Sequence, residues 1–214
     1  MAEQDLAEHD VEVVEEPQAH EPEPPPLDPE VAARRDAALE HVRVFGDPVL
    51  KAKARPVEVF DDRLREEVAR MGALMNDALG IGLAATQVGV LHRLLVYRVE
   101  HDSPVNALIN PVLEWSGGDK ETMEEGCLSL PGVHVDVERP TYVRVSAQDA
   151  TGEPILVEAS GLEARVIQHE MDHLDGVLIL DHASKDQRKD ALRALRGGDE
   201  QHTHEPSASA RSAG

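Results

Sequence analysis

The order of the sequence patterns predicts an α+β fold. One helical pattern comes first, several strand patterns follow it, and a second helical pattern comes after the strands. This order differs from the alternation of strands and helices that builds a parallel sheet. The length of 214 residues suits one domain of ordinary size and is short for two.

The first helix is predicted in DDRLREEVARMGALMNDALG, residues 61–80. Its apolar residues recur at the spacing of one helical face, and they are Leu64, Val68, Met71 and Met75. Asp61 is a suitable cap for the start of this helix, and Gly80 is a suitable stop.

Strands are predicted in four segments, which are RLLVYRV (93–99), VNALINPVL (105–113), TYVRVSAQ (141–148) and PILVEAS (154–160). The last two flank DATGE, in which Gly152 suits a tight turn. We therefore expect these two strands to pair as an antiparallel hairpin.

The second helix is predicted in ASGLEARVIQHEMDHLDG, residues 159–176. Ser160 and Glu163 have the spacing of a capping box at its start, and Gly176 fits a C-terminal stop. A last amphipathic helix is expected in SKDQRKDALRALRGG (184–198), with Ala191, Leu192 and Leu195 on one side.

The charge of the chain is concentrated near its start. The formal net charge is −21, and residues 1–30 hold eleven Asp or Glu, no Lys or Arg, and six Pro. A segment so acidic and rich in proline buries too little apolar surface to fold, so residues 1–40 are expected to form a disordered tail. We expect a second, polar tail at residues 197–214. Neither a signal peptide nor a membrane-spanning run fits the sequence.

The composition also limits the chemistry. One cysteine, Cys127, excludes an intrachain disulfide. Aromatic residues make up only 2% of the chain, so stacking on nucleic-acid bases and direct readout of nucleic acid are not expected.

A possible metal motif lies inside the second predicted helix, in QHEMDH. His169 and His173 are four residues apart and therefore share one helical face, where two imidazoles can bind the same ion. Glu170 lies beside them and can accept a proton from a metal-bound water. The alternative is two unrelated surface histidines. Leu162 and Val166 continue the histidine face as an apolar stripe, which favours burial and hence a metal.

The third ligand separates the classes of site. Metzincin proteases carry a third histidine six residues after the second, and this chain has Ile179 there. Asp181 and His182 are near in sequence, although either can equally be solvated. The remaining candidate is Cys127 in EEGCLSLPG, whose thiolate would complete a Cys/His/His site with one open position. The alternative for a lone cysteine is a buried structural thiol.

A third motif is the glycine-rich GIGLAATQ (80–87). Gly80 and Gly82 permit the close approach of another backbone, and the segment lacks the pattern of a phosphate-binding loop. The amide of Gln87 can donate to a developing oxyanion, although a surface glutamine is the commoner case.

The three motifs GIGLAATQ, EGCLS and QHEMDH, in this order, resemble the signatures of the peptide deformylase family. The similarity runs from about residue 41 to residue 196 and includes DPVLKAKARPV (47–57), where Lys51 replaces the usual arginine. The resemblance implies an α+β fold in which antiparallel strands surround a central metal-binding helix. It also implies a catalytic domain at 41–196, with the two tails outside it.

The resemblance implies the roles of the site residues. The metal ligands would be Cys127, His169 and His173. Glu170 would be the general base and acid for attack by a metal-bound water. Gln87 and the backbone N–H of Leu128 would stabilise the oxyanion. The family's metal is commonly Fe(II), and Zn, Ni or Co can take its place, because a thiolate with two imidazoles admits all of these.

The resemblance also implies the substrate, the N-formyl group of N-formylmethionine on newly synthesised polypeptides in the bacterial cytoplasm. The peptide backbone would lie along Ile81, Gly82 and Gly126, as an added strand. The methionine side chain would meet Ile81, Leu162 and Val166.

The resemblance leaves the roles of other residues open. His134 and Arg139 are expected to contact the peptide at most, and Asp172 and Asp175 are expected to be surface charges. The helix at 184–196 is either a contact for the ribosome or a solvated helix packed by its leucines.

Two rival functions are a metal-binding protein without activity and an HExxH peptidase. Mere metal binding needs neither Glu170 nor Gln87, and the residue at position 179 argues against the peptidase.

Overall fold

The computed structural model describes the backbone of residues 26–202 and the side chains of residues 26–196. Within this range no helix is both long and apolar enough to cross a membrane. Residues 1–25 and 203–214 lie outside the described residues. The expectation of disorder cannot be compared with the structure there.

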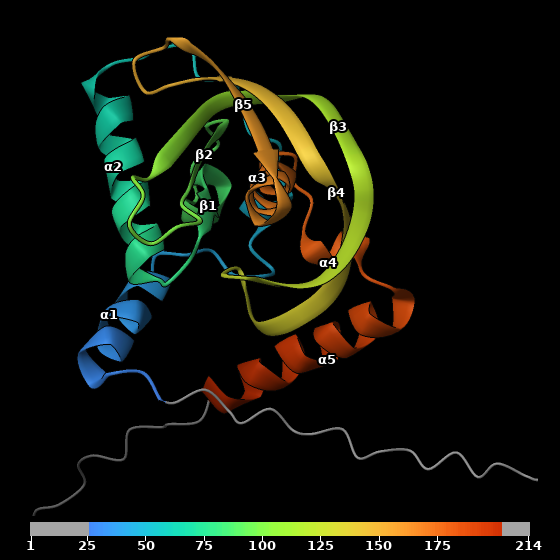
Figure 1. The fold of residues 1–214 in the computed structure, drawn as a ribbon. Coiled ribbons are helices and arrows are strands. Elements are labelled where there is room, and N and C mark those ends of the chain that lie inside the picture. The colour runs from blue at the N-terminus through green and yellow to red at the C-terminus, as the bar shows by residue number, and fades with distance from the viewer. Residues whose placement is uncertain (1–25, 203–214) are drawn as a thin grey trace, which may run out of the picture.

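A single antiparallel sheet forms the body of the fold. Its five strands follow one another in chain order, as β1 (Gly82–Ala84), β2 (Leu94–Tyr97), β3 (Asn106–Cys127), β4 (Leu130–Gln148) and β5 (Pro154–Ser160). The sheet curls around helix α3 (Gly161–Leu174), which is seen nearly end-on in Figure 1. The α+β class and the central helix inside antiparallel strands are therefore confirmed.

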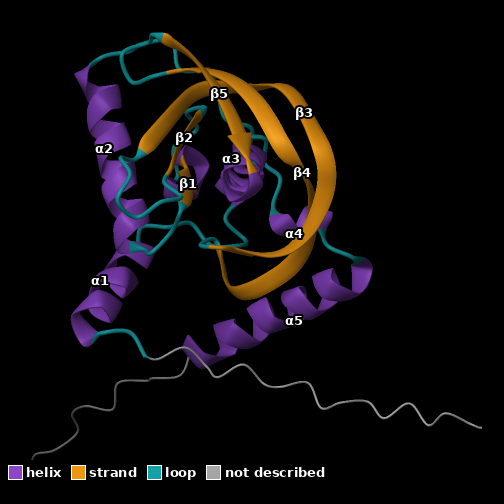
Figure 2. Cartoon of the chain, viewed as in Figure 1, coloured by secondary structure: helices purple, strands orange, loops and turns teal. Residues whose placement is uncertain are grey.

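The other helices are α1 (Pro29–Leu39), α2 (Asp62–Asp77), α4 (Ile179–His182) and α5 (Lys185–His202), with short 3₁₀ helices at Pro48–Lys51 and Ala85–Val88. Helices α1, α2 and α5 lie outside the curl of the sheet, whereas the short α4 lies against β3 and β4 (Figure 2). The helix α5 packs on β4, and α2 packs on β1 and β2.

The expectation of disorder is wrong at the inner ends of both tails. Helix α1 lies within residues 1–40, where the Asp28 side chain caps it by accepting from the N–H of Glu30 at 2.9 Å. Proline at its first position is compatible with a helix start. At the other end, α5 continues to residue 202, six residues past the predicted boundary at 196.

The first predicted helix, α2, begins and packs as expected. Asp61 accepts a hydrogen bond from the N–H of Leu64 at 3.1 Å, and the predicted apolar face packs on β1 and β2. The helix ends differently, because Leu79 and not Gly80 takes the left-handed conformation, with φ of 59°. The N–H of Gly80 then bonds to the carbonyl of Met75 at 2.8 Å, which completes a Schellman motif.

Helix α3 has the predicted ends but lacks the predicted capping box. The Ser160 side chain makes no capping bond, and Glu163 instead accepts from the hydroxyl of Tyr97 at 3.0 Å. At its other end Gly176 is left-handed, with φ of 74°, and the N–H of Val177 bonds to the carbonyl of Asp172 at 2.9 Å. This is again a Schellman motif.

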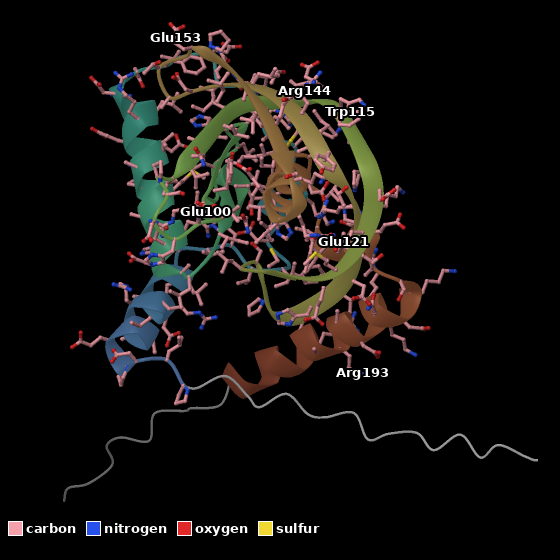
Figure 3. The ribbon with its side chains drawn as sticks, in the orientation of Figure 1. Glu100, Trp115, Glu121, Arg144, Glu153 and Arg193 are labelled. Atoms are coloured by element: carbon pink, nitrogen blue, oxygen red, sulfur yellow. The ribbon has the colours of Figure 1, made fainter. Side chains whose placement is uncertain are left out.

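The strands predicted at 93–99 and 154–160 correspond to β2 and β5, and the hairpin around Gly152 is present. The strands β3 and β4 are much longer than the segments 105–113 and 141–148, because they continue to the turn at Cys127. Most of residues 114–125 are exposed on both faces, so they lack the alternation that marks a half-buried strand. Figure 3 shows Trp115 and Arg144, a cross-strand pair, on the outside of this ribbon.

The core surrounds α3. Buried apolar residues of this helix, among them Ile167 and Leu174, pack against β2, β4 and β5. Each fully buried side chain of this size contributes about 1.5–3 kcal/mol. Because the core face of α3 is fixed by this packing, the position of its opposite face, which carries the histidines, is fixed as well.

Replacement of Gly176 by alanine is expected to lower the free energy of unfolding by about 2–3 kcal/mol. An alanine would keep a left-handed φ of 74°, and its Cβ would lie 2.7 Å from the carbonyl oxygen of Lys51. Gly132→Ala is the matched control, because its φ is 69° and nothing lies within 4 Å of the new Cβ. Urea unfolding of both variants checks this, and equal losses would show that contact with Lys51 contributes nothing.

Candidate active site

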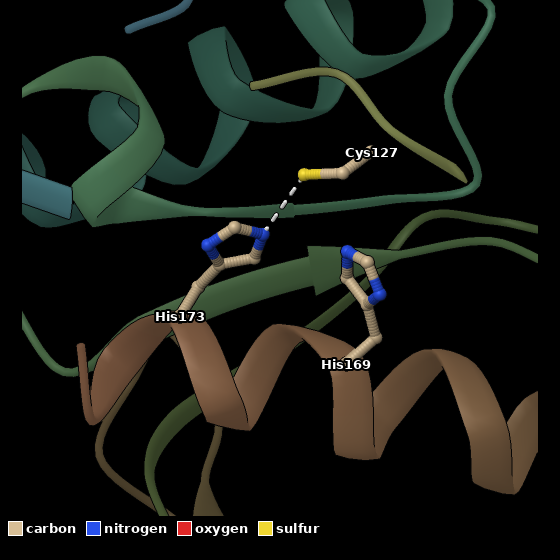
Figure 4. Close-up of side chains that lie close together, drawn as sticks. All are labelled: Cys127, His169 and His173. Carbon is tan, nitrogen blue, oxygen red and sulfur yellow. Dashed lines mark hydrogen bonds between the residues drawn. The ribbon is translucent and has the colours of Figure 1, made fainter. Parts of the chain in front are cut away.

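Three potential metal ligands meet at the cleft side of α3. The ligand atoms of Cys127, His169 and His173 all lie within 4.8 Å of one another, and the sulfur of Cys127 is 3.2 Å from Nε2 of His173. Figure 4 shows the two imidazoles rising from α3 toward the cysteine. Sulfur and imidazole nitrogen are ligands that divalent transition metals prefer.

The local structure explains why these residues meet. The histidines lie one helical turn apart on α3. Cys127 is the last residue of β3 and is paired with Leu130, the first residue of β4, so it occupies one end of a tight turn. The N–H of Ser129 bonds to the sulfur of Cys127 at 3.4 Å, which holds the thiol toward α3.

The other candidates for a third ligand have different partners. Asp181 pairs with Nζ of Lys51 at 2.5 Å, and His182 lies 2.8 Å from a carboxylate oxygen of Asp172. Ile179 is buried in the core between β4 and α5. Asp172 and Asp175 are ion-paired with Arg139 and Arg93, so neither belongs to the cluster.

A buried carboxylate orients one of the histidines. Oε2 of Glu125 lies 3.0 Å from Nδ1 of His169, so the Nε2 of this ring remains for the cluster. Arg139 donates to Glu125 at 2.7 and 3.0 Å, and Arg165 donates to it at 2.7 Å. Burial raises the pKa of Glu125, but the hydrogen bonds from His169 and Arg139 outweigh it and hold the pKa well below its usual value.

Sequence reasoning missed the role of Glu125. A partial signal exists, because Glu125 begins the EGCLS motif, but its two arginines come from other elements. The expectation that Arg139 contacts the peptide is not supported by the structure, because Arg139 is buried at 4% exposure and does not line the cleft. His134 does line it.

The surroundings of the cluster favour a positive charge. Burial lowers the pKa of His169, yet hydrogen bonds to Cys127 and Glu125 raise it well above the ordinary value. The pKa of His173 is lowered by burial and then by the positive charge of His169. The anionic Glu125 therefore stabilises positive charge at His169, while His173 is held neutral with its Nε2 near the sulfur of Cys127, and a neutral imidazole is the form that binds a metal.

Glu170 faces the cleft from the same helix. It is 3% exposed, its Oε2 has no hydrogen-bond partner among the described residues, and burial raises its pKa to about 7. A Cβ on Gly82 would lie 2.3 Å from its Oε1, so only glycine fits there. The close approach expected at Gly82 is therefore made by a side chain and not by another backbone.

Gln87 is buried and presents its amide nitrogen toward the cluster. Its Oε1 accepts from the N–H of Ala84 at 2.8 Å. Its Nε2 donates to Oγ of Ser129 at 3.2 Å and lies 3.7 Å from the sulfur of Cys127. The carbonyl bond fixes which end of the amide faces the cleft, so this group is a preorganised donor.

A cleft of about 440 Å³ opens onto these groups. Among its lining residues are all those predicted to bind substrate, together with both predicted oxyanion donors: Ile81, Gly82, Gly126, Leu162, Val166, Gln87 and Leu128. Val166 is 5% exposed, while Ile81 and Leu162 are more than 40% exposed, so the apolar stripe before His169 is partly a cleft wall. His173 is the most buried member of the cluster and does not line the cleft.

One edge of the sheet borders the cleft. The strand β1 is the first in the sheet order and pairs only with β2, so its other edge has no strand partner among the described strands. Helix α1 contributes Arg35 and Leu39 to the far wall, which the expectation of a disordered tail did not anticipate.

Replacement of Glu125 by glutamine is expected to weaken metal binding by about 10–100-fold. Glutamine lacks the charge that holds Nδ1–H of His169. It also removes the carboxylate that Arg139 and Arg165 share, and only Arg139 keeps another carboxylate partner, Asp172. The measurement is competition for the metal with a chelator. Glu124→Gln is the matched control, because Glu124 is an exposed residue of the same cleft wall and has no hydrogen bond to His169, Arg139 or Arg165. Unchanged affinity in Glu125→Gln would remove Glu125 from the support of the metal site.

Comparison with known proteins gives consistent results. The family model described as polypeptide deformylase matches residues 39–189. A peptide deformylase of Parafrankia sp. is 44% identical over 159 residues, which are 74% of this chain and 86% of that protein. A peptide deformylase 1 of Corynebacterium efficiens is 46% identical over 163 residues, which are 75% of this chain and 96% of that protein.

Solved structures agree with the sequence matches. A deformylase from Synechococcus elongatus in complex with actinonin has a TM-score of 0.70 and 45% identity, covering 73% of this chain and 86% of that one. A deformylase from Legionella pneumophila has a TM-score of 0.72 and 37% identity, covering 77% and 98%. The matched range 39–189 contains every residue that lines the cleft except Arg35.

Proposed function

The chain belongs to the polypeptide deformylase family, and on this basis we propose that it removes the N-formyl group from N-formylmethionine at the start of newly synthesised polypeptides. The products are formate and a free amine. The observation that carries the proposal is the cluster of Cys127, His169 and His173 at one cleft with the buried carboxylate of Glu170, whose Oε2 has no hydrogen-bond partner among the described residues.

The donor set fits one divalent metal ion held by Cys127, His169 and His173. One sulfur and two imidazole nitrogens converge, and Glu125 fixes the ring of His169 so that Nε2 faces the cluster. When bound, such an ion supplies a Lewis acid that polarises a carbonyl and lowers the pKa of water. Catalytic sites of this kind keep a position open beside three protein ligands.

Glu170 acts as the proton carrier in the proposed mechanism. It accepts a proton from the attacking water and passes it to the amine that leaves. Its buried position and its pKa of about 7 suit a group that must both take and release a proton near neutral pH.

The tetrahedral oxyanion is stabilised by two donors of the cleft. The Nε2 of Gln87 donates one hydrogen bond, and the backbone N–H of Leu128 donates the other. Because the carbonyl of Gln87 is already bonded to Ala84, the amide needs no reorientation when charge develops.

The peptide is proposed to add to the sheet along β1. Its backbone pairs with Ile81 and Gly82 on one side and meets Gly126 on the other, as in strand addition. The methionine side chain occupies the apolar wall of Ile81, Leu162 and Val166. Backbone pairing with one side-chain pocket favours methionine first and tolerates variety after it.

The test is release of free amine from formyl-Met-Ala-Ser by anaerobically purified protein. Acetyl-Met-Ala-Ser and an unblocked peptide are the controls. Amine from the formyl peptide alone is the expected result. Absence of release despite one bound metal per chain would favour a binding protein, and cleavage of internal amides would favour a peptidase.

We propose Fe(II) as the metal in the cell, with Zn, Ni or Co able to take its place. A partly accessible Cys127 thiolate beside Fe(II) is open to oxidation. Activity is therefore expected to decay faster in air than under nitrogen and to stay stable in air after exchange to Ni. Equal half-lives of the native protein in air and under nitrogen would exclude iron.

The proposed setting is the bacterial cytoplasm, where formylated chains are made. Contact between the helix at 184–196 and the ribosome stays a prediction. It is tested by co-sedimentation of the protein with ribosomes.

A further inference from the structure

Helix α5 has two different faces within its described side chains. On one face Ala191, Leu192 and Leu195 pack into the cluster formed with β4 and α4. This contact accounts for the apolar residues of the helix. Its basic residues are exposed, and Figure 3 shows Arg193 on the side that faces away from the sheet.

The exposed face forms a shallow groove of strongly positive character. Apart from Leu192 it is lined only by basic residues, which are Lys185, Arg188, Lys189, Arg193 and Arg196. We call these five residues the basic face of α5. Arg193 is paired with Asp190 at 2.7 Å and Arg188 approaches Asp181 at 3.6 Å. Among the described side chains the other three make no ion pair.

This face is unusual in a chain of net charge −21. The opposite charge is present at high density in the same chain, because residues 1–25 hold nine Asp or Glu and no Lys or Arg. Charge complementarity therefore exists between the two parts of one molecule.

The length of the acidic segment is sufficient for contact. A chain of 25 residues spans at most about 80–90 Å when extended. The folded part is a domain with a radius of gyration of about 15 Å. The acidic segment is joined to the folded part three residues before α1. Helix α1 lies near β4, because Arg35 and Leu39 of α1 line the same cleft as His134 of β4. Helix α5 packs on β4 as well. In Figure 1 the start of α1 and the helix α5 lie on the same side of the sheet.

We propose that the acidic segment 1–25 of this chain binds the basic face of α5 and competes there with other polyanions. Single exposed ion pairs are weak. Covalent attachment nevertheless raises the effective concentration of the segment near the helix to the millimolar range. The contact is electrostatic, so salt screens it.

Carbodiimide cross-linking of the full chain tests the contact directly. This reagent joins a carboxylate to a lysine amine only where the two touch. Cross-links from residues 1–25 are expected at Lys185 and Lys189, and they should disappear at about 0.5 M salt. Lys53 is an exposed lysine on another segment, makes no ion pair among the described side chains, and serves as the internal control. Lys120 is unsuitable as a cross-linking control, because it is already paired with Glu138. Equal cross-linking of Lys53, Lys185 and Lys189 would overturn the proposal.

Competition gives an independent readout that needs no enzymatic activity. The probe is a fluorescein-labelled single-stranded RNA at low salt. Conversion of the nine acids of residues 1–25 to their amides is expected to tighten its binding roughly tenfold. The added reversal Lys185→Glu/Lys189→Glu should remove this gain, whereas Lys53→Glu/Lys120→Glu, with the same change of charge, should keep it. A gain that survives the α5 reversal would mean general repulsion by the segment, which contradicts docking on α5.

Discussion

Replacement of Glu170 by glutamine is expected to lower kcat by about 100- to 10,000-fold while the bound metal is retained. Glutamine has nearly the size and shape of glutamate, so it fits the space beside Gly82 that admits no additional atom. It cannot accept a proton from water or return one to an amine. Because Glu170 lies outside the Cys127, His169 and His173 cluster, the change leaves the proposed ligands in place.

The experiment combines kinetics on formyl-Met-Ala-Ser with metal analysis of the same sample. KM is expected to change little, because the peptide contacts lie on β1 and on the apolar wall. Glu163→Gln is the matched control, since Glu163 is on the same helix but bonds to Tyr97 away from the cleft. Retained turnover in Glu170→Gln would remove this residue from the mechanism. Loss of metal together with turnover would make it part of the metal site instead.

The difference between the two glutamates illustrates what sequence can predict about this site. Glu170 is found from sequence because it lies on the same short helix as both histidines, at fixed local spacing. The role of Glu125 depends on side chains 14, 40 and 44 residues away, which are Arg139, Arg165 and His169. No local pattern encodes such contacts, since they arise only when β4 and α3 are packed on β3.

The fold shows the same division between local and tertiary signals. The ends of α3 can be predicted from Gly176 and from the helical periodicity of its apolar residues. The hairpin of β4 and β5 can be predicted from the turn residues around Gly152. The extension of β3 was missed because residues 114–125 are mostly exposed on both faces. The adjoining VHVDVE of β4 does alternate, with Val133, Val135 and Val137 buried, and this signal was available in the sequence. Helix α1 was missed because an acidic, proline-rich composition was extended too far along the chain.

Replacement of Cys127 by alanine is expected to abolish specific metal binding and turnover together. Alanine removes the only sulfur donor, and two imidazoles alone form an incomplete site. The loss of affinity should therefore exceed the roughly 10–100-fold expected for Glu125→Gln, which keeps all three donors. Ser129→Ala is the control, because Ser129 bonds to Gln87 in the same turn but offers no ligand to the cluster.

Thermal unfolding with and without added metal measures this effect independently of activity. A ligand that binds only the folded state raises its stability by about 2.7 kcal/mol at 100 times its Kd, so the wild-type chain should melt at a higher temperature when metal is added. Cys127→Ala should lose this shift, whereas Ser129→Ala should keep it. If Cys127→Ala retains the metal with unchanged affinity, the assignment of the thiolate as a ligand is wrong. Asp181 and His182 are then poor substitutes, because they are paired with Lys51 and Asp172. Glu170 is then the next donor to test, because its Oε2 has no partner among the described residues, and in that case Glu170→Gln would lose the metal that we expect it to keep.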